Sequence, residues 1–283
     1  MKPSAALVIP FLGFLCCAVD RDGSFPPLAI PARPLASPAA EQVLLRMEKQ
    51  SPDEREKEIL HQLASGNLPD FLRRPVEIEV EVVDSDSVRH RICIAVLPDY
   101  LSVGTDSAFC RLPMRPETAQ RLADQWNLLL PTPCIVDWID AAARLRIEPV
   151  TYAPEGDCNE QAERFRAHQQ DIEARHQAQP GILTSGLKKD IVLCSRIDSS
   201  AVPDRVAIYG WRRPDRSIIQ PLYCGHTHCY VDYSHGVRLI QSTAFIDGKS
   251  VDLRKALCDT LLFRLFSDED APLIDARYPL EQP

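Results

Sequence analysis

Two different hydrophobic periods alternate along the first hundred residues. Residues 41–50 and 52–64 have the pattern of helices. Ser51 is a natural N-cap for the second helix because Glu54 follows it at the capping-box spacing, and Gly66 is expected to end that helix. We therefore predict a pair of helices near the start of the folded part.

The next segment alternates apolar and acidic residues. Positions 76–83 read V-E-I-E-V-E-V-V, which is typical of a strand with one wet face. Residues 84–87 supply turn chemistry, and 89–97 are expected to return as a second strand. The glutamates of the first strand then lie across from Arg89 and Arg91, so ordinary cross-strand ion pairs are favoured over a cation site.

Helices are predicted in the middle of the chain and strands near both ends. This order favours an α+β fold, with N-terminal and central helices packed on a mixed or antiparallel sheet, over regular βαβ alternation. The remaining helices are expected at 116–129, 135–145, 160–177 and 253–266, and the remaining strands at 190–195, 205–209, 217–222, 229–233 and 237–241.

The first residues have the features of an export signal. A basic start is followed by an apolar run over 5–18, shorter than the roughly 20 residues that a membrane-spanning helix needs. We expect a signal peptide at 1–18, an extended and mobile proline-rich spacer at 19–38, and a secreted or periplasmic mature chain without a transmembrane segment. An uncleaved N-terminal anchor is the alternative.

Size and charge narrow the function classes. The rest of the chain is long enough for a buried core, and we expect a single α+β domain at 39–283, with a helical and hairpin part to about 180 and a strand-rich part at 181–283. The formal net charge of −8 argues against a general nucleic-acid binder. The expected partner is a polymer or peptide substrate.

Eight cysteines lie beyond the predicted signal peptide. An even number in an exported chain suggests at least one disulfide, whose pairing the spacing does not fix. The eight are Cys93, Cys110, Cys134, Cys158, Cys194, Cys224, Cys229 and Cys258.

Reactive side chains are densest between Gly225 and Arg238, where three of the seven histidines fall within ten residues. If the backbone between His226 and His228 is extended, both imidazoles lie on one face and can hold a metal such as zinc. Asp232 or His235 would supply a third ligand. The alternative is a polar loop whose histidines bond to the backbone.

A second interpretation uses Ser234 as a nucleophile. It lies on a turn that Gly236 would make sharp, and a nearby imidazole such as His235 could activate its hydroxyl. The pattern departs from the esterase elbow because Asp232 stands where that motif requires glycine. In these readings the candidate catalytic residues are His226, His228, Asp232, Ser234 and His235.

Three residues are assigned to substrate binding. Arg238, inside an apolar strand, needs a carboxylate partner, which is either Asp232 or a group on the substrate. Lys188 could meet a substrate carboxylate or phosphate, although such a residue is often a solvated strand start. Tyr230 completes this set.

A short motif carries a resemblance to an enzyme family. Residues 234–239, S-H-G-V-R-L, are similar to the S-H-G-C-x-R signature of L,D-transpeptidases, envelope enzymes that cross-link peptidoglycan through a cysteine. Val237 takes the place of that cysteine here, so the mechanism could operate only if Cys224 or Cys229 replaced it. The resemblance implies a link to the cell envelope.

Residues 186–239 also resemble an uncharacterised family of secreted bacterial proteins. The shared motifs are G-x-K-K-D, Y-G-W, I-Q-P-L and Y-V-D-Y-S-H-G-x-R-L. Such relatives often have histidine where this chain has Leu187 and Arg212, and the family brings no reaction with it.

Together these patterns lead to two functional hypotheses. The first is a secreted hydrolase-type enzyme that acts on a cell-envelope or extracellular polymer with the residues of 225–238. The second is a non-catalytic exported binding or envelope-structural protein, in which the same residues form a buried hydrogen-bond network.

Overall fold

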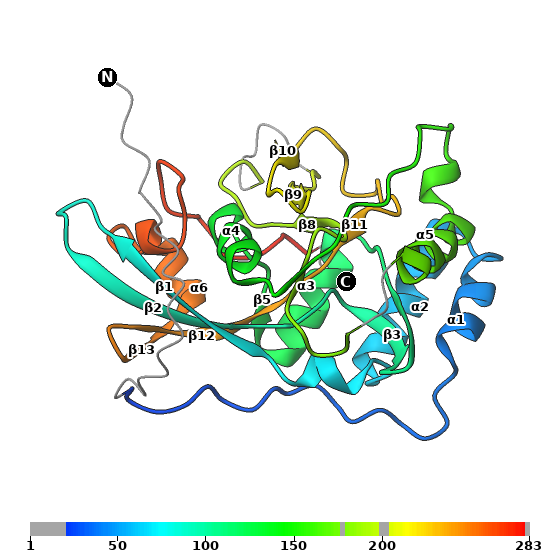
Figure 1. Ribbon diagram of the computed structural model, residues 1–283, viewed down its shortest axis with the longest axis horizontal. Coiled ribbons are helices and arrows are strands. Elements are labelled where there is room, and N and C mark those ends of the chain that lie inside the picture. The colour runs from blue at the N-terminus through cyan, green and yellow to red at the C-terminus, as the bar shows by residue number, and fades with distance from the viewer. Residues whose placement is uncertain (1–20, 176–178, 198–203, 281–283) are drawn as a thin grey trace.

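The computed structural model describes residues 21–175, 179–197 and 204–280 (Figure 1). The predicted signal peptide at 1–18 lies outside the described residues. Helices and several sheets, most of their strand pairs antiparallel, make up the fold. The predicted α+β class is therefore confirmed.

The larger sheet has five strands, and all of its pairs are antiparallel. Its order is β1 (Val76–Val83), β2 (Arg89–Val96), β12 (Ile240–Ile246) and β13 (Lys249–Asp252), and β5 (Leu128–Leu129) also pairs with β12. The predicted β1–β2 hairpin is confirmed. Its expected cross-strand ion pairs are also present, between Arg89 and Glu81 and between Arg91 and Glu79.

A second sheet of four strands supports the candidate site. Its order is β10 (Ile218–Tyr223), β9 (Ile208–Arg212), β8 (Lys189–Ile191) and β11 (His235–Gly236), and only the β8–β11 pair is parallel. Two shorter sheets join β3 (Ser102–Thr105) to β4 (Ala108–Arg111) and β6 (Leu145–Arg146) to β7 (Thr184–Ser185).

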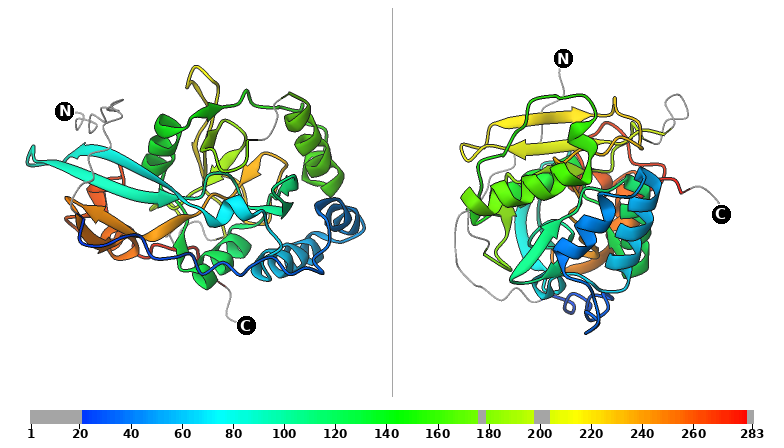
Figure 2. Two further views of the ribbon diagram at one scale, coloured as in Figure 1. Left: turned by 60° about the horizontal axis from the view of Figure 1, so that its bottom comes forward. Right: turned by 90° about the vertical axis from the view of Figure 1, so that its right-hand side faces the viewer.

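The helices α1, α2 and α5 gather at the end of the molecule opposite the β1–β2 hairpin (Figures 1 and 2). Buried aromatic side chains of α3 and α4, Trp126 and Trp138, lie in the hydrophobic core. The helices are α1 (Ala40–Met47), α2 (Pro52–Ala64), α3 (Pro116–Trp126), α4 (Pro133–Ala142), α5 (Ala162–Arg175) and α6 (Leu253–Cys258), with short 3₁₀ turns at Asp70–Arg73, Cys158–Glu160 and Phe263–Leu265.

Local side-chain chemistry explains where the helices begin and end. The predicted capping box of α2 is present: Ser51 accepts from the Glu54 amide, and Glu54 accepts from the Ser51 amide. Asn127, with a φ of 54°, ends α3 before the predicted limit at 129. α6 ends at Cys258 because the Asp259 carboxylate accepts the amides of Leu261 and Leu262 and so starts a turn.

The strand predicted at 229–233 is not formed. The Asp232 carboxylate accepts the Ser234 amide, and this local bond holds a turn in place of strand pairing. The predicted strand at 237–241 is displaced as well, because β11 ends at Gly236 and β12 begins at Ile240. Turn chemistry therefore outweighs the alternating pattern in residues 225–238, which we call the site segment.

The described part of the proline-rich spacer is extended, as expected, but it lies against the domain. The ring of Phe25 packs edge-on against Phe245 at 5.0 Å, and Ile30 is buried. Arg73 donates to the carbonyl of Pro31, which lies so close to Gly66 that a Cβ there would approach its oxygen to 2.6 Å. These contacts hold the segment against the domain, whereas its composition predicted a mobile spacer.

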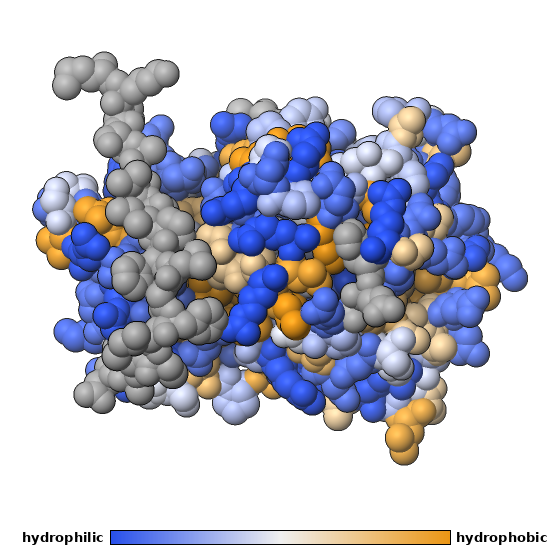
Figure 3. Space-filling view, viewed as in Figure 1, coloured by the Kyte–Doolittle hydropathy of each residue, from blue (hydrophilic) through white to orange (hydrophobic). Residues whose placement is uncertain are grey.

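Hydrophilic residues cover most of the face shown in Figure 3, and hydrophobic residues gather near its centre. Among the described helices, none combines the length and the apolar composition required to span a bilayer. The hydrophobic residues are instead concentrated in a core that both larger sheets share.

Candidate functional site

The candidate site lies where β8 and β11 run side by side. His235 is aligned with Lys189, and the Lys189 amide donates to the carbonyl of Ser234. This pairing brings two segments more than forty positions apart in the sequence into contact. The site is therefore supported by sheet pairing, although its central residues lie in a turn.

Two imidazoles and two phenol rings pack together at this place. The ring of His226 stacks on Tyr230 with 4.0 Å between centroids, and it lies 5.0 Å from Tyr223. The ring centroid of His235 lies 5.7 Å from that of Tyr230 and 6.5 Å from that of His226. We refer to His226, Tyr230 and His235, together with Asp232 and Lys189, as the imidazole cluster.

Asp232 connects the members of the imidazole cluster. One carboxylate oxygen accepts the amide and the hydroxyl of Ser234. The other lies 3.4 Å from the Lys189 ammonium and 3.3 Å from the Tyr230 hydroxyl. Burial alone would raise the pKa of Asp232, but His235, Lys189 and the Ser234 donors outweigh burial and lower it. A fixed negative charge therefore lies beside the two imidazoles.

The two imidazoles are neutral near pH 7. Burial lowers the pKa of His226, and Lys189 adds to the effect. Burial also lowers the pKa of His235 to about 4, and Asp232 only partly opposes this. His235 is 0 % exposed, and within the described ranges neither of its ring nitrogens has a hydrogen-bond partner. Neutral buried imidazoles without hydrogen-bond partners are rare in proteins. Those that do occur are often found at functional positions.

Ser234 lies beside the imidazole cluster but points to a carboxylate. Its hydroxyl donates to Asp232, and the residue is 1 % exposed. Within the described residues, this hydroxyl makes no hydrogen bond to an imidazole nitrogen that would accept its proton. In this arrangement Ser234 holds the turn, and a role as nucleophile would require it to leave Asp232.

The structure places His228 away from His226. Its Nδ1 lies 2.6 Å from Glu117 of α3, and its Nε2 lies 3.3 Å from the sulfur of Cys229. The two histidines therefore have different partners, and the described residues contain no group of three or more potential metal ligands. Zinc binding by this chain stays a prediction, which metal analysis of purified protein would test.

Two residues assigned to substrate binding have internal partners. The Arg238 guanidinium donates to the carbonyls of Leu97, Pro98 and Thr184 and lies 4.5 Å from the Tyr100 ring centroid. The Lys188 ammonium donates to the carbonyl of Tyr233. Both side chains are almost fully buried, so in this arrangement they stabilise the site segment from inside.

Lys189, the neighbour of the predicted Lys188, is the lysine of the imidazole cluster. Lys189 begins β8 and reaches Asp232, whereas Lys188 lies just before the strand and donates to the carbonyl of Tyr233. The sequence alone could not distinguish the two lysines, because their partners lie more than forty positions away. Tyr230 was predicted and does lie in the cluster, whereas Tyr223 was not singled out.

Asp190, the residue after Lys189 on β8, belongs to a different buried group. Its carboxylate accepts from the Tyr100 hydroxyl at 3.0 Å, and burial raises its pKa to about 6. It lines a cavity with space for roughly one water molecule, beside Arg238 and Trp211. This cavity lies beside β8, the strand that also carries Lys189 of the imidazole cluster.

The burial of His235 predicts acid sensitivity. An unfolded chain would bind a proton at His235 near pH 6.5, whereas the folded chain resists protonation until about pH 4. Stability contributed by the neutral form is therefore complete above pH 6.5 and is lost as the pH falls towards 4. This one group should reduce the free energy of unfolding by about 3 kcal/mol over that range.

Urea unfolding at pH 7 and at pH 4.5 measures this effect. The drop in unfolding free energy should be smaller in His235→Asn than in the native chain, whatever the stability of the variant at pH 7. His61→Asn, at an exposed position on α2, is the control and should keep the native drop. Equal drops in all three proteins would contradict the assignment.

A pair of thiols lies next to the site segment. None of the eight described cysteines is joined in a disulfide, but the sulfurs of Cys194 and Cys224 are 3.7 Å apart. A hydrogen bond from Cys194 lowers the pKa of Cys224, which favours the reactive thiolate. Only a small movement would bring the sulfurs to the bonding distance of about 2.05 Å.

Oxidised glutathione is expected to join these two cysteines. The Cys224 thiolate displaces one glutathione, and the Cys194 thiol then displaces the second, so the chain loses two hydrogen atoms. Peptide mapping without reductant should find the Cys194–Cys224 cross-link in the native chain and in Cys158→Ser. Cys194→Ser should instead keep glutathione on Cys224, and a cross-link between other cysteines would refute this pairing.

Comparison of this chain with known protein families, curated proteins and solved structures finds no match. The resemblances to L,D-transpeptidases and to secreted bacterial proteins therefore stay predictions, and function has to be argued from the geometry of the imidazole cluster.

Proposed function

We propose that this chain is an exported hydrolase-type enzyme that acts on a polymer or peptide of the cell envelope or extracellular space. The observation that supports this most is the imidazole cluster. In it, the half-buried neutral imidazole of His226 lies near the imidazole of His235, which is buried without partners. A cluster that served only to hold the turn would pair the nitrogens of His235.

His226 is the group best placed to perform acid–base chemistry. It is only half buried, so a substrate or water can reach it, and its lowered pKa leaves a lone pair free at neutral pH. In the proposed reaction it takes a proton from water as the water attacks the polymer bond. It then returns that proton to the leaving group, so the imidazole is regenerated.

The other members of the cluster position and tune His226. Tyr230 holds the imidazole ring by stacking, and its hydroxyl is tied to Asp232. The Asp232 carboxylate can stabilise the imidazolium that forms during proton transfer, and the Lys189 ammonium limits how far it does so. Water is favoured as the nucleophile because the Ser234 hydroxyl is occupied by Asp232.

A non-catalytic binding protein is the second candidate. It is favoured by the number of site residues whose polar groups are paired inside the protein, such as Ser234, Lys188 and Arg238. In that case His226 and Tyr230 would form a recognition surface of stacked rings.

Incubation of the purified protein with cell-wall fragments and with peptide polymers separates the two candidates. Release of soluble fragments that grows linearly with protein concentration supports the hydrolase. Retention of the protein on the fragments without any release supports the binding protein and contradicts the hydrolase.

A further inference from the structure

A cleft of about 310 Å³ opens beside the imidazole cluster. It lies between α2, the start of α5 and the site segment, which contributes Cys229 and Val231. These two residues flank Tyr230, a member of the imidazole cluster. The volume of the cleft falls at the lower end of the range for small-molecule sites.

Arg55 supplies a positive charge to this cleft. The residue is 8 % exposed, and within the described ranges its guanidinium has no hydrogen bond or ion pair. It lies 5.8 Å from the ring centroid of Phe165, which also lines the cleft. Glu56, Glu160 and Glu163 act on this charge from nearby, but none of them forms an ion pair with the guanidinium, so it can still take a carboxylate from outside.

The opposite charge is also present in the cleft. Asp157 and Glu160 line it, and the pKa of Glu160 is raised by burial, by Asp157 and by Asp232 of the imidazole cluster. Arg115 lines the cleft too, but Asp53 already pairs with it at 2.7 Å. A simple anion would be repelled by the acidic side of the cleft, and a simple cation would be repelled by Arg55.

The remaining surface suits carbon chains. Ile59, Phe165 and Val231 present apolar groups to the same cleft. Glu56 adds a carboxyl whose pKa burial raises to about 7, so part of it is protonated near neutral pH and can donate a hydrogen bond to a carbonyl oxygen. This combination matches a short peptide better than it matches a sugar or a phosphate.

We infer that the cleft binds a short peptide that carries both a carboxylate and an ammonium group. Arg55 takes the carboxylate, Asp157 and Glu160 attract the ammonium, and the apolar side chains pack against the carbon atoms between them. The inference rests on the proposed function and narrows its substrate class, because the cleft borders the segment that carries the imidazole cluster.

Isothermal titration of the purified native chain with three matched probes tests this inference. Triglycine has both termini, triglycine amide lacks the carboxylate, and N-acetyltriglycine lacks the ammonium. Triglycine should bind, and loss of the carboxylate should weaken binding about tenfold or more. Loss of the ammonium should also weaken binding, because Asp157 and Glu160 then have no positive group on the ligand to attract.

The protein-side change should reproduce the ligand-side change. Arg55→Gln should bind triglycine about tenfold more weakly and should no longer distinguish triglycine from its amide, since the two groups act as one pair. Lys57→Gln removes the same charge from an exposed position of the same helix and should bind as the native chain does. Thermal melting checks that both variants fold.

Three results would overturn the inference: no saturable binding of triglycine, equal binding of triglycine and its amide to the native chain, or equal binding by Arg55→Gln and Lys57→Gln. The first two results use only the native protein, so the inference can be overturned even if Arg55→Gln does not fold. Because no activity is measured, the inference can fail while fragment release still supports the proposed hydrolase.

Discussion

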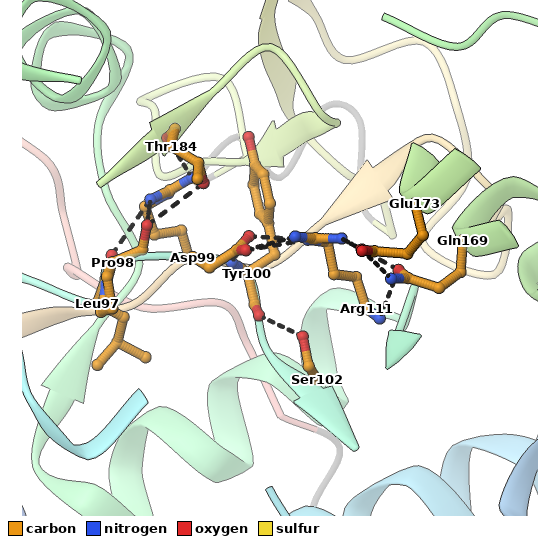
Figure 4. A network of polar contacts seen from close by, with 10 residues as sticks. Leu97, Pro98, Asp99, Tyr100, Ser102, Arg111, Gln169, Glu173 and Thr184 are labelled. Carbon is orange, nitrogen blue, oxygen red and sulfur yellow. Dashed lines mark hydrogen bonds and ion pairs between the residues drawn. The ribbon is translucent and has the colours of Figure 1, made fainter. Parts of the chain in front are cut away.

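Asp99→Ala should lower the free energy of unfolding by about 3–5 kcal/mol, because it leaves a buried guanidinium without its main partner. Arg111 donates to both oxygens of Asp99, at 2.9 Å from Nε and 2.6 Å from Nη2, and both side chains are almost fully buried. Figure 4 shows the pair together with Gln169 and Glu173 of α5. Glu173 is 3.3 Å from Arg111 but partly exposed, so it can replace Asp99 only in part.

Urea unfolding of matched variants measures this cost. Glu81→Ala breaks the exposed ion pair with Arg89 and should cost at most about 1 kcal/mol. The double variant Asp99→Leu with Arg111→Met should be more stable than Asp99→Ala, since no uncompensated charge remains. If Asp99→Ala cost no more than Glu81→Ala, the buried pair would not stabilise the fold.

Much of the fold could be predicted because its determinants are local. The β1–β2 hairpin follows from strict alternation and a turn rich in aspartate and serine, and α2 follows from its capping box at Ser51. The same local rules failed at 229–233, where the Asp232 side chain competes with strand pairing. The period of apolar positions in a sequence does not show whether strand pairing or a local side-chain hydrogen bond is the more stable arrangement.

The candidate site could be predicted only in part. His226, Tyr230, Asp232 and His235 do gather in one place, because they lie on one short turn and the strand that follows it. The partners of Arg238 lie more than fifty positions away in sequence, and no spacing reveals them. Arg55 lies still further from the site segment, and its role depends on how α2 packs.

His226→Gln should reduce the proposed hydrolysis by a factor of about 10² to 10⁴, which is the usual loss on removing a general acid–base group. Glutamine has a similar size and can still lie over Tyr230, but it cannot take a proton at neutral pH. The fold should therefore remain while turnover is lost. His61→Gln, at an exposed position on α2, is the matched control and should keep the native rate.

Ser234→Ala separates the two nucleophiles. If water attacks, this variant should lose far less activity than His226→Gln, apart from any change in stability from the lost bond to Asp232. A loss equal to that of His226→Gln in a folded variant would point to the serine hydroxyl instead.

The pH dependence of kcat/KM for fragment release tests the central proposal most directly, because it follows the protonation of His226. The groups around this imidazole are Tyr223 on β10, Lys189 on β8, and Tyr230, Asp232, His235 and Arg205. The native chain should lose activity on acidification with a midpoint below 6.5, and the residual activity of His226→Gln should lack this limb. An acid limb that persists unchanged in His226→Gln, or native-like rates in that variant, would contradict the account.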